Sequence, residues 1–230
     1  MKSLAIIPAR GGSKRIPRKN IRPFLDKPII AYSIEAALKS GLFAEVMVST
    51  DDEEIARVAQ EYGASVPFLR SREASDDFAT TAQVLEEVLI QYKAQGKSFE
   101  VACCLYPTAP FVTAALLQES YTRLSEGDFD TVFPVLKYSY PIWRSLKVEQ
   151  GKAVMNWPEH LSSRSQDLPA AFHDAGQFYW FRVDRFLKDK RLFTGNSGVI
   201  ELSELEAQDI DSETDWKLAE LKYKLLHRLD

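Results

Sequence analysis

Leu4-Ala5-Ile6-Ile7-Pro8 leads directly into Ala9-Arg10-Gly11-Gly12-Ser13-Lys14-Arg15-Ile16-Pro17-Arg18-Lys19-Asn20. The first run is short, apolar and bounded by a proline, which predicts a strand buried on both faces in a parallel sheet. The second run, the opening loop (residues 9–20), combines two adjacent glycines with five cationic side chains. Glycines let backbone N–H groups turn toward a ligand without an obstructing Cβ, and cations neutralise an anion. We therefore expect the opening loop to bind a polyphosphate.

The opening loop lacks two common nucleotide-binding motifs. It contains neither G-x-x-x-x-G-K-[ST] nor G-x-G-x-x-G, so the usual ATPase and dinucleotide-binding interpretations lose their main support. A solvated basic turn that happens to contain glycines remains an alternative, because clusters of basic residues are often surface charge.

Strand and helix patterns alternate along most of the chain. Strands are expected at residues 46–49, 66–69, 99–106, 131–135 and 177–181, and amphipathic helices at 28–41, 55–62, 84–92, 113–124 and around 216–225. Thr50 with Glu53 predicts a capping box before the second helix. This alternation predicts an α/β fold with a mainly parallel sheet. We find no internal repeat or linker, so residues 1–230 are expected to form one domain.

The pattern changes between residues 137 and 171. Tryptophans, charges and prolines alternate there around the pair Gly151-Lys152, which predicts an irregular β-rich insert laid over the sheet. The segment from Tyr138 to Trp157 is more apolar and aromatic than a covering hairpin needs. We therefore expect a dimer interface in this insert.

The composition is that of an ordinary globular protein. Of 230 residues, 45% are hydrophobic and 27% charged, and the net charge of −4 with cations gathered in the opening loop argues against a nucleic-acid partner. No apolar run approaches the roughly 20 residues of a membrane span, and the start is too short for a signal peptide. We expect a cytoplasmic protein. Cys103 and Cys104 are expected to be buried free thiols on opposite faces of a strand.

Residues 7–20 resemble the N-terminal signature of the CMP-sugar synthetases, the cytidylyltransferases that activate sialic acid and related nine-carbon acids. Two later runs, Arg164-Ser165-Gln166-Asp167-Leu168-Pro169 and Phe172-His173-Asp174-Ala175-Gly176-Gln177-Phe178-Tyr179-Trp180, are most similar to family members that use pseudaminic acid. The resemblance covers nearly the whole chain. It implies a Rossmann-like, GT-A-like nucleotidyltransferase fold, a homodimer, CTP as co-substrate and Mg²⁺ as cofactor. It also implies transfer of CMP to the anomeric hydroxyl of the sugar acid, with release of pyrophosphate.

The resemblance assigns the opening loop to CTP. The family's CTP-binding positions correspond to Arg10, Gly11, Gly12, Ser13, Lys14, Lys19 and Asn20. Lys19 is assigned to the α-phosphate, where an ammonium would stabilise the charge that grows in the transition state. Lys19, Arg10 and Asp211 are accordingly the predicted catalytic residues. For each loop residue, a solvated surface charge is the alternative.

Asp209-Ile210-Asp211 is a candidate metal site. In an extended segment its two carboxylates share one face, and such hard oxygen ligands suit Mg²⁺ that bridges phosphate oxygens. The alternative is that Asp211 caps the final helix. The residues alone favour the cap, whereas the resemblance favours a metal site formed by Asp209 and Asp211.

The long polar loop after residue 69 is expected to contact the base. The resemblance puts Arg70 near the cytosine, where its donors could favour CTP over UTP, with Asp76 in the same nucleotide site. Alternatively, Arg70 pairs with Asp76 or Asp77 on the surface.

The sugar pocket is expected to lie along residues 164–177. Arg164 is the candidate for the sugar carboxylate and Gln177 for its hydroxyl or acetamido groups, with Gln166 and Asp174 also in the pocket. Tyr106 stands where the family commonly has glutamine, which weakens a sialic acid assignment. The alternatives are a synthetase for sialic acid, legionaminic acid or an eight-carbon keto acid, or a catalytically silent nucleotide-binding module.

Overall fold

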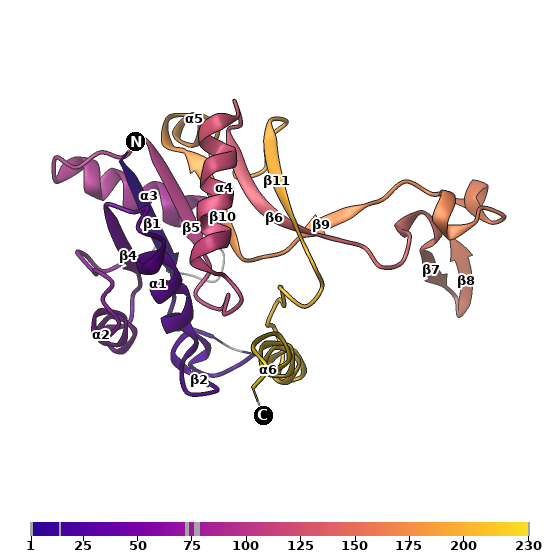
Figure 1. Cartoon of the computed structure of the whole chain (residues 1–230), viewed down its shortest axis with the longest axis horizontal. Helices are drawn as coiled ribbons and strands as arrows, with labels where there is room; N and C mark the ends of the chain where they lie inside the picture. Colours follow the sequence, from indigo (N-terminus) through magenta and orange to yellow (C-terminus); the bar gives the residue numbers. More distant parts are fainter. Residues whose placement is uncertain (1, 14, 72–73, 76–78, 230) are drawn as a thin grey trace.

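The computed structural model describes residues 2–13, 15–71, 74–75 and 79–229. A central sheet lies between helices, and an extended arm leaves it on one side (Figure 1). The strands are β1 (Ser3–Pro8), β2 (Pro23–Phe24), β3 (Lys27–Pro28), β4 (Glu45–Ser49), β5 (Val101–Leu105), β6 (Thr131–Lys137), β7 (Leu146–Glu149), β8 (Lys152–Met155), β9 (Phe172–Asp174), β10 (Phe178–Arg182) and β11 (Ser197–Leu202). The helices are α1 (Ile29–Ser40), α2 (Glu53–Glu61), α3 (Thr81–Ala94), α4 (Ala114–Glu126), α5 (Val183–Asp189) and α6 (Glu213–His227), with 3-10 turns η1 (Lys19–Ile21), η2 (Ile142–Arg144), η3 (Pro158–His160) and η4 (Ser165–Asp167).

The main sheet has the strand order β11-β6-β10-β5-β1-β4, with β9 paired to β6. β1 runs parallel to both of its neighbours, and its residues Leu4 to Ile7 are completely buried, as predicted. β10 and β9 run against the other strands of this sheet. The prediction of a mainly parallel sheet is therefore confirmed. Parallel strands bring their carboxyl ends to one edge, and the opening loop starts at that edge.

Each face of the sheet packs against its own helices. One core joins β-strand side chains to α1, α2 and α4, and the other joins them to α3 and α5. Cys103 belongs to the first core and Cys104 to the second, so both are buried free thiols on opposite faces, as predicted. Gly41 ends α1 with a φ of 67°, which glycine adopts without strain.

A third apolar cluster holds the opening loop against α6. Ile16 from the loop, Ile210 from the segment before α6 and Trp216 from α6 are all buried together with Phe24. The two segments are far apart in the sequence, and this cluster fixes them side by side. Charged residues that flank Ile16 and Ile210 are thereby brought close to one another.

Two local predictions are wrong. Residues 66–69 do not form a strand, and the pairing to β4 consists of a single bridge between Met47 and Ser65. Pro67 has no N–H to donate, which works against a continued ladder at this position. The N-cap of α2 is Asp52, whose side chain accepts from two backbone N–H groups of the first turn, and Thr50 instead accepts from the Asp52 N–H.

The insert forms an arm (residues 138–171) between β6 and β9. Its hairpin, β7 and β8, turns at Gln150 and Gly151, which both have positive φ values of 52° and 77°. Figure 1 shows that the arm extends away from the sheet, so the prediction that it lies over the sheet is wrong. The described helices include none with both the length and the apolar character needed to span a membrane.

Candidate active site

A polar cavity of about 490 Å³ lies where the opening loop meets the carboxyl ends of β1 and β5. It brings together five of the predicted nucleotide-binding residues: Arg10, Ser13, Lys19, Asn20 and Arg70. Its other described lining residues are Pro8, Arg15, Ala74, Ala79, Thr81, Val84, Tyr106, Pro107 and Thr108. The predicted residues Lys14 and Asp76 lie outside the described part of the chain. The position agrees with the general rule that ligands bind beyond the carboxyl ends of parallel strands.

The opening loop is held in shape by contacts to the end of β4. The Gly11 N–H donates to Asp51 Oδ1 at 3.0 Å, and a Cβ at Gly11 would lie 2.7 Å from Asp52 Oδ2. Glycine is therefore required at this close approach, whereas Gly12 faces open space. Asn20 is buried and donates from Nδ2 to the Arg10 carbonyl at 2.9 Å, so its amide shapes the loop.

One cation of the loop supports the fold instead of facing the cavity. Arg18 pairs with Asp52, with Nη1 and Oδ2 2.5 Å apart, and also with Glu54. The hydrogen bond from Arg18 holds the pKa of the Asp52 carboxyl below its usual range. This ion pair ties the loop to the first turn of α2.

Lys19 joins the opening loop to the Asp-x-Asp segment. Its Nζ donates to the Ile210 carbonyl at 2.7 Å and lies 3.8 Å from Asp211 Oδ1, and its side chain is 21% exposed. Burial lowers the pKa of Lys19, although the charge of Asp211 opposes this change. A partly desolvated ammonium beside a cavity can bind phosphate, so the predicted role fits its position.

In the Asp-x-Asp segment Ile210 is buried, whereas Asp209 is exposed and Asp211 is half-buried. Partial desolvation, followed by the charge of Asp211, raises the pKa of Asp209. The helix cap is Ser212, which forms a capping box with Asp215, so the alternative that Asp211 caps α6 is wrong.

The chemistry of this segment fits Mg²⁺. Among the described residues, no group of three or more acidic, histidine or cysteine side chains is placed to hold a metal ion. Mg²⁺ is commonly bound by one or two carboxylates together with substrate phosphates, and it does not need a cage made of protein alone. Asp209 and Asp211 could therefore hold an ion that phosphate oxygens complete.

Arg70 lines the cavity and lies against the end of β4. It donates from Nε to Ser49 Oγ at 3.1 Å and from Nη2 to the Ser49 carbonyl at 2.6 Å. Burial lowers its pKa. Nearby, the Tyr106 hydroxyl lies 3.5 Å from Thr81 Oγ1. Arg70 is thus a fixed, partly buried cation on the cavity wall.

The predicted sugar-binding residues fall into two groups. Asp174 and Gln177 lie next to the sheet: Asp174 accepts from the Tyr179 hydroxyl and the Gly176 N–H, and Gln177 Nε2 donates to the Glu206 carbonyl at 2.7 Å. The amide oxygen of Gln177 is buried, with no hydrogen-bond partner in the described part of the chain.

The second group lies on the arm. Arg164 is 73% exposed and pairs with Asp167 at 2.7 Å, and Gln166 belongs to the same short turn. None of the four predicted sugar-binding residues is among the described residues that line the cavity formed by the opening loop, and the two on the arm lie on a segment that extends away from the sheet (Figure 1). One chain therefore does not bring all the predicted substrate-binding residues together.

Several residues of the site have no specific role in the sequence predictions, although Arg15 is one of the five loop cations expected to bind a polyphosphate and Asp51 is an alternative metal ligand if Asp209 and Asp211 fail. Arg15 and Thr81 line the cavity, Asp51 orients the loop, and Ser49 anchors Arg70. Ser49 could have been found in the same way as Asp51, since both lie at the carboxyl end of a predicted parallel strand.

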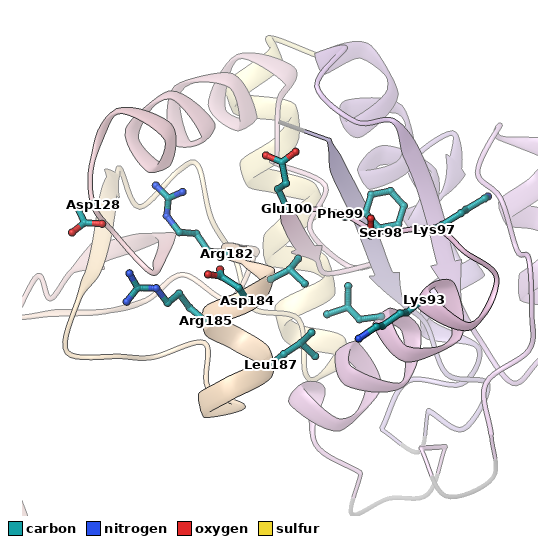
Figure 2. Close-up of a pocket in the computed structure, with 12 residues that line it drawn as sticks. Lys93, Lys97, Ser98, Phe99, Glu100, Asp128, Arg182, Asp184, Arg185 and Leu187 are labelled. Atoms are coloured by element: carbon teal, nitrogen blue, oxygen red, sulfur yellow. The ribbon is translucent and has the colours of Figure 1, made fainter.

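A second, larger cavity of about 670 Å³ lies at the opposite edge of the sheet (Figure 2). Leu187, Leu89 and Phe99 contribute apolar walls, and charged residues lie around them. Arg182 is committed to three backbone carbonyls, those of Phe129, Leu124 and Gly127. This cavity borders the amino end of β5, whereas Tyr106 at the carboxyl end borders the polar cavity. It is not the site formed by the opening loop.

Comparisons with known proteins agree with this geometry. The sequence profile of the cytidylyltransferase family matches residues 4–222. The chain is 43% identical over 228 residues to a pseudaminic acid cytidylyltransferase of Campylobacter jejuni, covering 99% of this chain and 98% of that protein. It is 33% identical over 230 residues to a CMP-N,N′-diacetyllegionaminic acid synthase of Legionella pneumophila, covering 96% and 95%.

A solved structure extends the comparison to the fold. The structure of a CMP-2-keto-3-deoxy-manno-octonic acid synthetase complexed with CTP matches over 100% of both chains, with a TM-score of 0.72 at 18% identity. The predicted nucleotidyltransferase fold is thus confirmed, and the profile match runs from β1 into α6. This chain belongs to the cytidylyltransferase family and is a CTP-dependent nucleotidyltransferase.

Proposed function

We propose that this chain transfers CMP from CTP to the anomeric hydroxyl of pseudaminic acid and releases pyrophosphate. The observation that carries the proposal is the polar cavity lined by cations of the opening loop, two of which, Lys19 and Arg15, also contact the Asp-x-Asp segment beside it. The full-length similarity to a pseudaminic acid cytidylyltransferase supports the choice of sugar.

In this mechanism the protein positions a triphosphate and neutralises its charge. Arg10, Ser13 and the backbone N–H of Gly12 would hold the phosphates, since the Gly11 N–H is bonded to Asp51. The Lys19 ammonium would contact the α-phosphate, where negative charge grows during attack. Arg70 would contact the cytosine. Asp209 and Asp211 would hold Mg²⁺, which supplies charge neutralisation at the phosphate oxygens when it is bound.

We further propose that the enzyme acts as a homodimer in which the arm serves the neighbouring chain. Arg164 and Gln166 do not line the cavity of their own chain, and the hairpin exposes the apolar side chains of Leu146 and Val148. Contact between the arms of two chains, or between the arm of one chain and the sheet domain of the other, would cover such side chains. Arg164 could then bind the sugar carboxylate bidentately in the site of the partner.

A substrate panel tests the function. Pyrophosphate release is measured with CTP, UTP and ATP, each combined with pseudaminic, sialic, legionaminic and eight-carbon keto acids. We expect the highest kcat/KM for CTP with pseudaminic acid. Release that is faster with another acid would reassign the sugar, and CTP binding without release from any pair would favour a silent nucleotide-binding module.

A further inference from the structure

Arg15 occupies one oxygen of the candidate metal site. Its Nη2 lies 2.8 Å from Asp211 Oδ1, and the Lys19 ammonium lies 3.8 Å from the same oxygen. Asp211 Oδ1 is therefore contacted by two cations of the opening loop. A metal ion that binds this oxygen has to compete with Arg15, because two cations at one carboxylate oxygen repel each other.

The fold places this ion pair, but does not make it strong. Ile16, the neighbour of Arg15, and Ile210, the neighbour of Asp211, are both buried in the same apolar cluster. The two backbones are thereby fixed at a distance that lets the side chains meet. The pair itself is exposed, at 69% for Arg15 and 44% for Asp211, and exposed pairs contribute little to stability. A better partner can therefore break it.

Arg15 and Lys19 differ in how firmly they are held. Lys19 donates to the Ile210 carbonyl and is mostly buried, so it is anchored beside the Asp-x-Asp segment. Arg15 has its described ion pair with Asp211 and lines the cavity expected to hold the triphosphate. A guanidinium binds phosphate oxygens bidentately, and a triphosphate carries more charge than one carboxylate. Arg15 is the more exposed of the two cations, and a triphosphate is a stronger partner for it than Asp211.

We propose that Arg15 exchanges partners when nucleotide binds: its guanidinium holds Asp211 in the nucleotide-free protein and moves to the triphosphate, which frees Asp211 for the ion that arrives with CTP. This proposal rests on the proposed function for its nucleotide and metal. It assigns Arg15 a positioning role, since the residue controls when Asp211 becomes available. Metal binding is thereby coupled to nucleotide binding.

The first test uses Mn²⁺ alone, detected by electron paramagnetic resonance, with no nucleotide present. Arg15→Ala should bind Mn²⁺ about fivefold more tightly than the parent, because the competing cation is gone. The gain should disappear in the double variant Arg15→Ala/Asp211→Asn. Arg57→Ala is the matched control, since Arg57 forms an exposed pair with Glu61 on α2, away from the Asp-x-Asp segment. Unchanged or weaker Mn²⁺ binding by a folded Arg15→Ala would overturn the proposal.

The second test examines the other half of the exchange. CTP affinity is measured by calorimetry in EDTA, without metal or sugar acid. Arg15→Ala should weaken CTP binding about tenfold, whereas Arg57→Ala should not change it. Equal CTP affinity in Arg15→Ala and the parent would show that the guanidinium does not move to the phosphates. The proposal that Arg15 exchanges partners would then be overturned. Neither test needs turnover, so failure of the substrate panel and failure of the exchange are separate results.

Discussion

The opening loop and the arm both carry residues expected to bind substrate, and they differ in how the chain holds them. The loop is fixed by in-chain contacts: Gly11 to Asp51, Arg18 to Asp52 and Lys19 to the Ile210 carbonyl. The arm projects from the sheet (Figure 1), and its Arg164 contacts Asp167 of the same turn. This difference is the reason for our proposal that a single chain builds the nucleotide site, whereas the sugar site takes a further surface from a partner. The predictions below test each side of that comparison.

The largest expected effect is in the loop. Lys19→Ala should lower kcat about 100-fold, since removing one donor from a developing negative charge typically has an effect of that size. Steady-state kinetics with CTP and pseudaminic acid measures it, with thermal unfolding as a check on the fold. Lys39→Ala is the control, because this exposed lysine pairs with Glu35 on α1, at a distance from the cavity. Near-parental turnover in a folded Lys19→Ala would remove the α-phosphate assignment.

Charged substitutions on the arm should weaken the proposed dimer. The double variant Leu146→Asp/Val148→Asp places two charges on one face of β7. We expect the dissociation constant of the dimer to rise about 30-fold. Light scattering over a concentration series measures this. Lys147→Ser is the control because residue 147 points to the other face of the strand. A parent protein that is monomeric at all concentrations would show that the exposed apolar residues are not a dimer interface.

Mixing two inactive variants tests whether the arm serves the partner. In mixed dimers of Lys19→Ala and Arg164→Ala, one of the two sites combines an intact loop with an intact arm from the other chain. About a quarter of the parental activity should return. If the arm serves its own chain, every site in the mixture lacks one residue and no activity returns.

Substitution of Arg70, the residue proposed to contact the cytosine, should have a smaller effect, on the discrimination between CTP and UTP. Arg70→Ala should narrow the ratio of kcat/KM between CTP and UTP about tenfold, because the proposed contact distinguishes the two bases. Ser49→Ala removes one anchor of Arg70 while leaving its charge, so it should reduce discrimination less. Equal losses for CTP and UTP would place Arg70 in phosphate binding or in the scaffold.

The same comparison shows what the sequence could predict. The buried strand at residues 4–8 follows from a short apolar run and is confirmed, since Leu4 to Ile7 are completely buried. The expectation that Asp209 and Asp211 share one face follows from side-chain alternation and stays a prediction, although Ile210 between them is buried. The local patterns predicted the wrong N-cap for two helices, because another residue near the helix start caps each of them. Ser212 caps α6 in place of Asp211, and Asp52 caps α2 in place of Thr50.

Contacts between distant segments were beyond sequence reasoning. Lys19 meets the Ile210 carbonyl across 191 residues, and no spacing rule connects those positions. The direction of the arm was also missed, because an alternating hairpin pattern does not say which surface covers it. The family resemblance identified the loop residues as a group, but the pairing of Arg15 with Asp211 required the three-dimensional structure.

The smallest expected effects are changes in the free energy of unfolding when one ion pair is removed from the opening loop or from the arm. Asp52 caps α2 and pairs with Arg18, whereas Asp167 pairs with Arg164 on the exposed arm. Asp52→Ala should lower the free energy of unfolding by about 1–2 kcal/mol at pH 7, and Asp52→Asn by less, because asparagine still caps the helix. Asp167→Ala should change it by less than about 0.5 kcal/mol.

The pH dependence of these differences follows from the lowered pKa of Asp52. A carboxyl whose pKa is lower in the folded than in the unfolded protein stabilises the fold above the unfolded value, about 3.9, and loses this contribution as the pH falls through the folded value. The gap between the parent and Asp52→Asn, measured by urea unfolding, should therefore shrink between pH 7 and pH 3. A gap that stays constant over this range would mean that the Arg18 pair contributes nothing to stability, and that the opening loop is no better anchored by charge than the arm.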